Sequence, residues 1–398
     1  MSGSDPTDAT DLTGATTTGA ATSGTATTGT ATTGTAAAGD VPAAAPTAAP
    51  RTAAAPAEAA ALDRLNAWAG LGTLPGDGPL TSLTPLTGGA QNLLFTLRRA
   101  DGTELVLRRP GRHLRTGALD AFRREGRALA ALADTDVPHP RLYASVLDEE
   151  VLGAPFSVLE KIDGFAPRGT LPGRYAEEAG WRRAVAFALV DAAAKLAAVD
   201  PAAHGLADLG RPEGWLRRQT PKYLKLLHGY RVDPAYREHE SPLVDTVADW
   251  LTAHTPEQGA TGIVHGDLQF ANVMFAHHAP RLAAVVDWEM ASLGDPLLDL
   301  AWILTAWREE GDPPGSAPQF RPWDGMPGRA ELVAYYGEST GRDVSAFRWY
   351  QVLACFRLAA LLEGSYARAL AGKMDRATGE GLHTYAAWLW AKARQEIA

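Results

Sequence analysis

The chain has 398 residues, a formal net charge of −9 and an isoelectric point near 5.6. This length suffices for one two-lobed enzyme with a sizeable core, while the acidic balance argues against a nucleic-acid-binding surface, which needs a concentrated basic field. The single cysteine, Cys355, excludes an internal disulfide and a zinc–cysteine cluster and is typical of a reducing compartment.

Residues 1–60 are rich in Ala, Thr, Gly, Ser and Pro and contain no aromatic residue. Such a segment cannot bury enough apolar surface to order itself, so we expect a disordered tail. The tail lacks the basic start and apolar block of a secretory signal, and no run in the chain reaches about 18 uninterrupted apolar residues. The sequence therefore predicts a cytoplasmic protein.

Residues 61–161 show the pattern of a small β-rich lobe. A helical pattern at 62–71 is followed by strand patterns at 93–99 and 104–109, which flank Asp101-Gly102, a typical hairpin turn. A helix is predicted at 118–132, because Phe122 and Leu129 recur at helical spacing, and two short strands follow at 141–147 and 156–160.

Residues 162–398 are dominated by helical patterns, with short strands only within 262–275 and 281–287. The predicted helices are 175–199, 212–227, 241–253, 296–307, 329–336, 344–371 and 376–395. Cys355 falls inside one of these apolar patterns, so a buried thiol is expected. The order of elements predicts an α+β, bilobal fold with a β-rich N-terminal lobe, a larger helical C-terminal lobe and a cleft between them.

The segment from Ile263 to Glu289 contains the side chains best suited to chemistry. It holds His265-Gly266-Asp267, then Asn272, and Asp287 after an apolar strand pattern. Phosphoryl transfer needs a base for the attacking hydroxyl and hard oxygen ligands for Mg²⁺, and these residue types supply both. Two other interpretations are an ordinary turn with a strand cap, and a metal hydrolase that also uses His277-His278, a pair more typical of a hairpin tip.

This segment resembles the catalytic loop of the aminoglycoside-phosphotransferase-like family, and the resemblance covers roughly residues 80–390. It implies a protein-kinase-like fold with Asp267 as catalytic base and His265 bracing the loop. It also implies that Asn272 and Asp287 bind Mg²⁺ on ATP or GTP, the co-substrate. In the same pattern Asp299 is either a solvated acid or an acceptor for catalytic-loop amides, and the resemblance favours the acceptor.

Asp295 precedes Pro296 and is predicted to be the N-cap of the helix that follows.

The N-terminal lobe offers a set of nucleotide-contacting candidates. Gly88 and Gly89, in a turn that ends at Asn92, would let backbone amides approach phosphates. Arg108 occupies the strand where kinases carry a phosphate-binding lysine, and Glu125 is its expected charge partner; the alternative is a solvated edge arginine that pairs with Glu125.

The segment 156–164 resembles the hinge between the lobes. Backbone groups of Glu160 to Ile162 are expected at the adenine edge.

The acceptor is predicted to be a small molecule with a hydroxyl group, with no nucleic-acid or membrane partner and no protein partner that the sequence identifies. Residues 301–398 contain 11 acidic and 11 basic residues, which argues against polycationic aminoglycosides. The tryptophans of this region are more typical of core than of a ligand cage. Three segments resemble the acyl-CoA-dehydrogenase-linked branch of the family: Val106-Leu107-Arg108-Arg109-Pro110, Val137-Pro138-His139-Pro140 and Gly294-Asp295-Pro296. This resemblance favours a metabolic hydroxyl such as a hydroxyacyl thioester over a macrolide.

Two other functions stay open on sequence grounds. A catalytically silent nucleotide-binding regulatory module would explain arginine where lysine is usual. A protein kinase is disfavoured because Gly266 replaces the arginine that usually precedes the catalytic aspartate, and no Ala-Pro-Glu segment follows Asp287.

Overall fold

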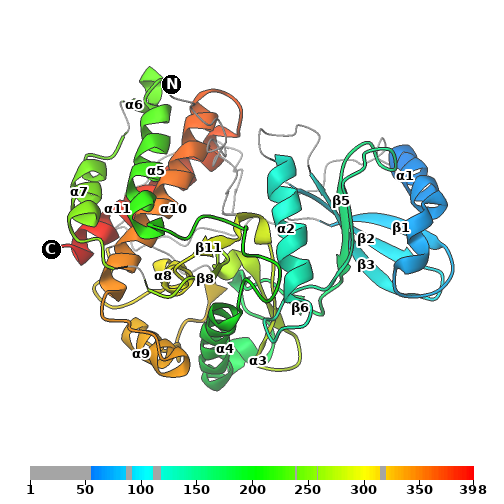
Figure 1. Cartoon of the computed structure of the whole chain (residues 1–398), viewed down its shortest axis with the longest axis horizontal. Helices are drawn as coiled ribbons and strands as arrows, with labels where there is room; N and C mark the ends of the chain where they lie inside the picture. Colours follow the sequence, from blue (N-terminus) through cyan, green and yellow to red (C-terminus); the bar gives the residue numbers. More distant parts are fainter. Residues whose placement is uncertain (1–54, 87–91, 111–117, 238–239, 258, 314–319) are drawn as a thin grey trace, which may run out of the picture.

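The structure is a computed structural model, and it describes residues 55–86, 92–110, 118–237, 240–257, 259–313 and 320–398 (Figure 1). Most of the predicted tail, residues 1–54, lies outside this part of the chain. Helix α1 spans Ala55–Ala67, so residues 55–60, which were assigned to the disordered tail, are helical. The last residues of the low-complexity segment are alanine-rich and continue into the apolar pattern around Leu65, which extends the helix toward the N-terminus.

A five-stranded antiparallel sheet with the order β1-β2-β3-β5-β4 forms the N-terminal lobe. Its strands are β1 (Leu80–Leu86), β2 (Asn92–Arg99), β3 (Glu104–Pro110), β4 (Leu142–Val146) and β5 (Phe156–Glu160). The Asp101-Gly102 hairpin is confirmed: Gly102 has a φ of +90°, and Asp101 accepts a hydrogen bond from the amide of Thr103. Glycine adopts a positive φ without steric strain, which explains why the sequence has Asp-Gly at this turn.

One face of this sheet is covered by α1 and the 3-10 helix η1 (Ala69–Thr73), and the core between them includes Leu65, Leu97 and Phe156. Helix α2 (Ala118–Leu132), whose bounds are those predicted, lies between the sheet and the helical lobe (Figure 1). Its residues Leu129 and Leu132 belong to the larger core, and this orientation brings Glu125 to the boundary between the lobes.

The C-terminal lobe is mainly helical (Figure 1). Its helices are α3 (Arg174–Glu177), α4 (Ala179–Ala198), α5 (Trp215–Tyr230), α6 (Pro234–Arg237), α7 (Leu243–Ala253), α8 (Leu297–Thr305), α9 (Arg329–Thr340), α10 (Phe347–Leu370) and α11 (Arg376–Glu396). Helices α8 and α10 form the centre of the core, and every residue of α8 is buried. Cys355 on α10 is fully buried, as predicted.

Short strands frame the chemistry-bearing segment in this lobe. They are β6 (Gly164–Phe165), β7 (Gly169–Thr170), β8 (Gly262–Val264), β9 (Val273–Ala276), β10 (Leu282–Val285), β11 (Ser292–Gly294) and β12 (Phe320–Arg321), with the 3-10 helices η2 (Phe270–Asn272) and η3 (Trp288–Met290). Strand β8 pairs with β11, while β9 pairs with β10 and β6. His277 and His278 lie in the turn between β9 and β10, so the predicted hairpin tip is confirmed.

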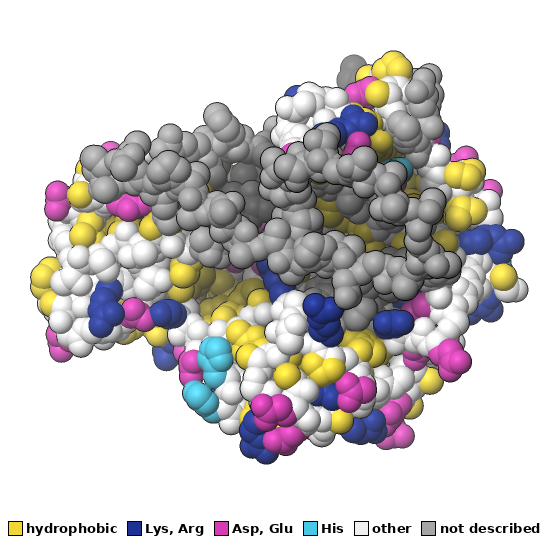
Figure 2. All heavy atoms as spheres, turned by 180° about the vertical axis from the view of Figure 1, so that it is seen from behind, with side chains coloured by type: hydrophobic (Ala, Val, Ile, Leu, Met, Phe, Trp, Pro, Cys, Tyr) yellow, Lys and Arg dark blue, Asp and Glu magenta, His cyan; other side chains and the backbone are white. Residues whose placement is uncertain are grey.

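The element order confirms the α+β prediction: a β-rich N-terminal lobe precedes a larger helical one. Within the described residues, none of the helices combines the length and apolar character needed to cross a membrane. Figure 2 shows Lys and Arg side chains interspersed with Asp and Glu on the described part of one face.

Candidate active site

The loop His265-Gly266-Asp267 follows β8, and its backbone requires glycine at the centre. Gly266 has a φ of +85°, and a Cβ placed there would lie 2.9 Å from the carbonyl oxygen of Met290. A larger residue would push the loop away from η3. The glycine therefore lets the loop approach the segment that follows Asp287.

His265 braces this loop through both of its ring nitrogens. The amide of Asp267 donates to Nδ1 at 3.2 Å, so Nδ1 carries no proton and Nε2–H donates to the carbonyl of Val286 at 3.1 Å. Burial lowers the pKa of His265 to about 4, against the opposing effect of the Asp287 charge. The imidazole is therefore neutral at pH 7 and links the loop to the residue just before Asp287.

Asp299 of α8 also binds this loop, through the backbone amides of two of its residues. Its Oδ2 accepts the amide of His265 at 2.7 Å and its Oδ1 accepts the amide of Gly266 at 2.9 Å. The predicted acceptor role is thus confirmed. Burial raises the pKa of Asp299 to about 6, and the two amides, with the charge of Arg357, lower it in part.

Asp295 departs slightly from its predicted N-cap position. Helix α8 begins at Leu297 with Pro296 as the N-cap residue, one position later than expected. The Asp295 carboxylate still accepts the amide of Leu297, while its Oδ2 accepts the amide of Gly259 and the hydroxyl of Tyr350.

Asp267 is a buried carboxylate with three side-chain donors. Gln269 and Trp302 donate to Oδ1 at 2.7 and 2.8 Å, and Asn272 donates to Oδ2 at 2.7 Å. Burial raises the pKa of Asp267 to about 7, the nearby Asp287 charge adds to this, and the three donors oppose it. A carboxyl group with a pKa near neutrality can accept a proton and release it again.

Asn272 and Asp287 meet at the end of the β9–β10 hairpin, where the amide of Val286 donates to the carbonyl of Asn272 at 2.9 Å. The side-chain nitrogen of Asn272 is held by Asp267, so its Oδ1 is the atom left for a cation. The backbone of Asp287 adopts the left-handed conformation, with a φ of 68°. Asp287 is the only non-glycine residue with positive φ in the described part of the chain. Such backbone strain is common at functional sites.

The donor set of these two residues fits Mg²⁺. An amide oxygen and a partly exposed carboxylate are hard ligands, and Mg²⁺ commonly takes one or two such groups from the protein and the rest from phosphates and water. The described residues contain no cluster of three or more His, Cys, Asp or Glu side chains suited to hold a metal.

Arg108 connects the N-terminal sheet with this site. Its guanidinium forms an ion pair with Glu125 of α2, and its Nη2 lies 2.9 Å from Asp287 Oδ1 and 3.3 Å from Glu289 Oε2. Asn92, at the start of β2, also approaches Glu289, at 3.5 Å. The structure therefore brings five acidic, basic and amide side chains from both lobes together.

The structure gives less information on the other residues predicted to contact the nucleotide. Gly88 and Gly89 lie outside the described residues. Glu160 ends β5, and its amide donates to the carbonyl of Arg141 at 2.8 Å, so that amide is not available to a nucleotide. Ile162 follows in the half-buried segment that joins the lobes.

Three site residues were not identified from the sequence: Gln269, Trp302 and Glu289. Gln269 and Glu289 each lie two positions after a predicted site aspartate, within the motif itself. Trp302 lies three positions after Asp299, on the same face of a helix, and this spacing was the available signal.

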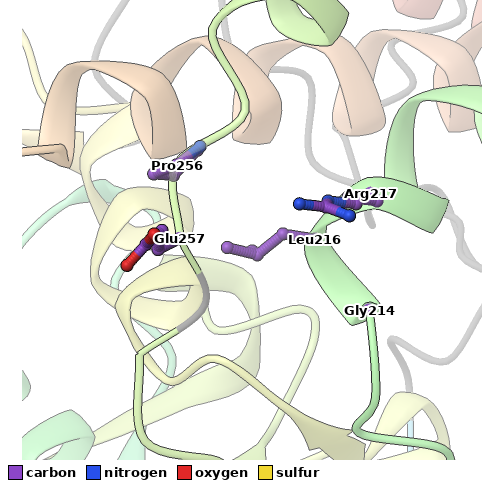
Figure 3. Close-up of a pocket in the computed structure, with 5 residues that line it drawn as sticks. All are labelled: Gly214, Leu216, Arg217, Pro256 and Glu257. Atoms are coloured by element: carbon purple, nitrogen blue, oxygen red, sulfur yellow. The ribbon is translucent and has the colours of Figure 1, made fainter.

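A pocket of about 260 Å³ lies elsewhere in the helical lobe, between the start of α5 and the loop after α7 (Figure 3). Leu216 and Arg217 point toward Pro256 and Glu257 across it, and Gly214 lies at its edge. None of the predicted site residues lines this pocket.

Sequence comparison agrees with the geometry. The profile of the phosphotransferase enzyme family (APH) matches residues 82–335. Acyl-CoA dehydrogenase family member 10 of Mus musculus is 30% identical over 315 residues, which are 76% of this chain and 28% of that protein. The human family member 11 is 28% identical over 291 residues, 71% of this chain and 36% of that protein. The chain thus spans well under two thirds of either relative.

Solved structures show the same architecture. A candidate aminoglycoside phosphotransferase from Ralstonia eutropha aligns with a TM-score of 0.69 and 30% identity over 84% of this chain and 98% of that chain. The macrolide 2'-phosphotransferase MphH from Brachybacterium faecium aligns with a TM-score of 0.51 and 22% identity over 81% and 97% of the two chains, which shows the fold alone.

The two lobes, the buried loop aspartate and the strained Asp287 after a short hairpin define a protein-kinase-like phosphotransferase. With a family profile that covers most of its length, the chain belongs to the phosphotransferase enzyme family (APH).

Proposed function

We propose that this protein transfers the γ-phosphate of ATP or GTP to a hydroxyl group of a small molecule. The observation that carries the proposal is the contact between Asp267 and Asn272, which joins a buried base to the amide whose oxygen faces the cation site with Asp287. Phosphoryl transfer needs these two functions side by side.

In this mechanism Asp267 orients the acceptor hydroxyl and takes its proton as the oxygen attacks the γ-phosphorus. The bond from the γ-phosphorus to the bridging oxygen breaks, and the nucleoside diphosphate leaves. Asn272 Oδ1 and the Asp287 carboxylate would hold Mg²⁺, which supplies charge neutralisation on the phosphates when bound. His265 and Asp299 keep the loop in place during this exchange.

The N-terminal lobe would bind the nucleotide. Arg108, oriented by Glu125, is positioned beside Asp287, and its Nη2 would donate to a phosphate oxygen. Gly88, Gly89 and Asn92 would approach the phosphates, and the segment from Glu160 to Ile162 would meet the base. Relatives of the same fold were solved with AMP-PNP and with GDP, which supports a nucleotide donor and leaves ATP and GTP as alternatives.

The acceptor we favour is a hydroxyacyl thioester or a related metabolic alcohol. Both curated relatives are named as members of an acyl-CoA dehydrogenase family. Most tryptophans of this region are core residues: Trp302, Trp307, Trp349, Trp388 and Trp390 are buried, while Trp323 is half-buried and packs against Trp307 and Phe320. The buried tryptophans therefore do not support a binding site for a large apolar acceptor.

The test is Mg²⁺-dependent release of ADP or GDP with hydroxyacyl-CoAs, macrolides and aminoglycosides as acceptors. We expect one class to stimulate release in the wild type and Asp267→Ala to abolish the stimulation, because the base is lost. If the protein binds nucleotide but shows no turnover that depends on Asp267, the silent regulatory module is the better description.

A further inference from the structure

Trp302 and Gln269 both donate hydrogen bonds to the same carboxylate oxygen of Asp267, the candidate base. The indole Nε1–H of Trp302 and the amide Nε2–H of Gln269 both donate to Asp267 Oδ1, at 2.8 and 2.7 Å. A carboxylate oxygen has two lone-pair directions, so these two donors fill the acceptor capacity of Oδ1.

The other carboxylate oxygen of Asp267, Oδ2, can accept one more hydrogen bond. Asn272 Nδ2 donates to Oδ2 at 2.7 Å, and it also donates to the Asp267 backbone carbonyl at 2.9 Å. Among the described residues this is the one side-chain donor that contacts Oδ2, so one lone pair of that atom remains. On this carboxylate, a reacting hydroxyl therefore finds an unfilled acceptor position only at Oδ2.

Trp302 is itself held firmly. It is fully buried on α8, and the guanidinium of Arg357 lies 5.0 Å from its ring centroid. Arg357 is fixed in turn by donation to the Tyr223 hydroxyl at 3.1 Å. On the same face of α8, Asp299 binds the backbone of the catalytic loop, so one helix fixes both the loop and the carboxylate that it carries.

We propose that Trp302 and Gln269 are positioning residues that fill Oδ1 of Asp267 and thereby assign the proton-accepting role to Oδ2. This inference rests on the proposed function, in which Asp267 is the base. The proton of the acceptor hydroxyl moves to Oδ2, the new bond forms between the acceptor oxygen and the γ-phosphorus, and the diphosphate leaves. Trp302 and Gln269 exchange no proton in this step.

The experiment compares Trp302→Phe with Trp349→Phe. Trp349 is also buried and donates its indole N–H to a backbone carbonyl, that of Leu251 at 2.9 Å, but it lies on α10 and does not contact Asp267. Both changes remove one N–H from a buried ring. Turnover is measured with Mg²⁺, the donor nucleotide and the acceptor that stimulates the wild type, or with water as acceptor if none does.

We expect Trp302→Phe to lower kcat about 10-fold to 100-fold, because a hydrogen bond to a charged group is lost, while KM and nucleotide Kd change less than about twofold. Trp349→Phe should keep kcat within about twofold. Gln269→Met is the second variant, and it should also lower kcat about 10-fold with KM unchanged.

The outcomes separate this inference from the proposed function. If Asp267→Ala retains turnover, the proposed function fails. If Asp267→Ala is inactive but Trp302→Phe matches Trp349→Phe in kcat, Trp302 serves packing alone and the inference is overturned. If Trp302→Phe does not fold, Gln269→Met decides, and an unchanged kcat in that variant overturns the inference.

Discussion

The protonation of Asp267 depends on two opposing effects. Burial and the Asp287 charge raise its pKa to about 7, whereas donors from Gln269, Asn272 and Trp302 stabilise the ionised form. The same carboxylate must be ionised to accept a proton, so its pKa governs the acid side of the pH dependence of the proposed enzyme.

We expect kcat/KM to rise with pH up to about 7 and then to level off, since the ionised fraction of Asp267 grows as pH passes its pKa. At pH 5 activity should be about 100-fold below the plateau, which is tenfold for each pH unit. The check is a pH–rate profile from pH 5 to 8, with nucleotide binding followed over the same range as a control. An unchanged kcat/KM between pH 5 and 7 would contradict this assignment.

Gly266 offers a second test at a single residue. Gly266→Ala should reduce activity at least 10-fold and lower stability by more than about 2 kcal/mol, because the left-handed backbone and the Met290 carbonyl both oppose a Cβ. Gly311 has a similar φ of +88° with open space around its Cβ position, so Gly311→Ala should cost only about 1 kcal/mol and leave activity intact. Thermal unfolding and nucleotide release measure both effects. Equal behaviour of the two variants would show that the Met290 contact is unimportant.

At the level of elements, α8 organises the site because it is anchored at several points. Asp295 accepts the amide of Leu297 at its start, and Asp299 binds the catalytic loop. Lys392 of α11 donates to the carbonyls of Thr305, the last residue of α8, and of Trp307 just beyond it. Lys392 is almost fully buried and also pairs with Asp312, while burial lowers its pKa. A cation at the C-terminal end of a helix satisfies carbonyls that have no partner in the helix.

We expect Lys392→Met to lower the free energy of unfolding by about 2–4 kcal/mol, because two carbonyls and a carboxylate lose a buried donor. Lys373→Met, at an exposed lysine, serves as the control and should change stability by less than about 0.5 kcal/mol. Urea unfolding of both variants measures the difference. The anchoring role would be refuted by equal midpoints in the two variants.

The elements that the sequence predicted well are those with long, regular patterns. Helix α2 has its predicted bounds, and the Asp101-Gly102 hairpin is where its turn signal placed it. Two-residue strands such as β7 and β12 were not predicted, because they are too short for alternation to be visible and they pair with each other across a long stretch of chain.

The site was only partly predictable for a related reason. Asp267, Asn272 and Asp287 lie in one motif, so residue type and spacing identify them together. Trp302 was interpreted as core, and it is buried, but its N–H reaches Asp267, 35 residues earlier in the chain. Only the packing of α8 under the loop makes that contact, and no local pattern reports it.

At the scale of the whole molecule, Arg108 is a buried polar link between the lobes, beside contacts of Arg124 with the Glu289 carbonyl and of Arg127 with Asp208. Its side chain is largely buried between Glu125 on α2 and Asp287 and Glu289 in the C-terminal lobe. One buried cation therefore serves both the fold, by neutralising Glu125, and the proposed nucleotide site. A substitution of Arg108 alone would affect both stability and nucleotide binding. Substituting Glu125 as well separates the two effects, because no buried carboxylate is then left without a countercharge.

We expect Arg108→Met to lower the free energy of unfolding by about 3–5 kcal/mol, because the buried Glu125 carboxylate then lacks a countercharge. The double variant with Glu125→Leu should recover at least about 2 kcal/mol of that loss, since an apolar pair replaces the ion pair. Both variants should bind nucleotide at least 10-fold more weakly, because neither has the phosphate-binding guanidinium. Urea unfolding and nucleotide titration measure the two effects separately. Recovered stability with wild-type nucleotide affinity in the double variant would show that Arg108 serves the fold alone, whereas recovered stability with lost affinity would assign it both roles.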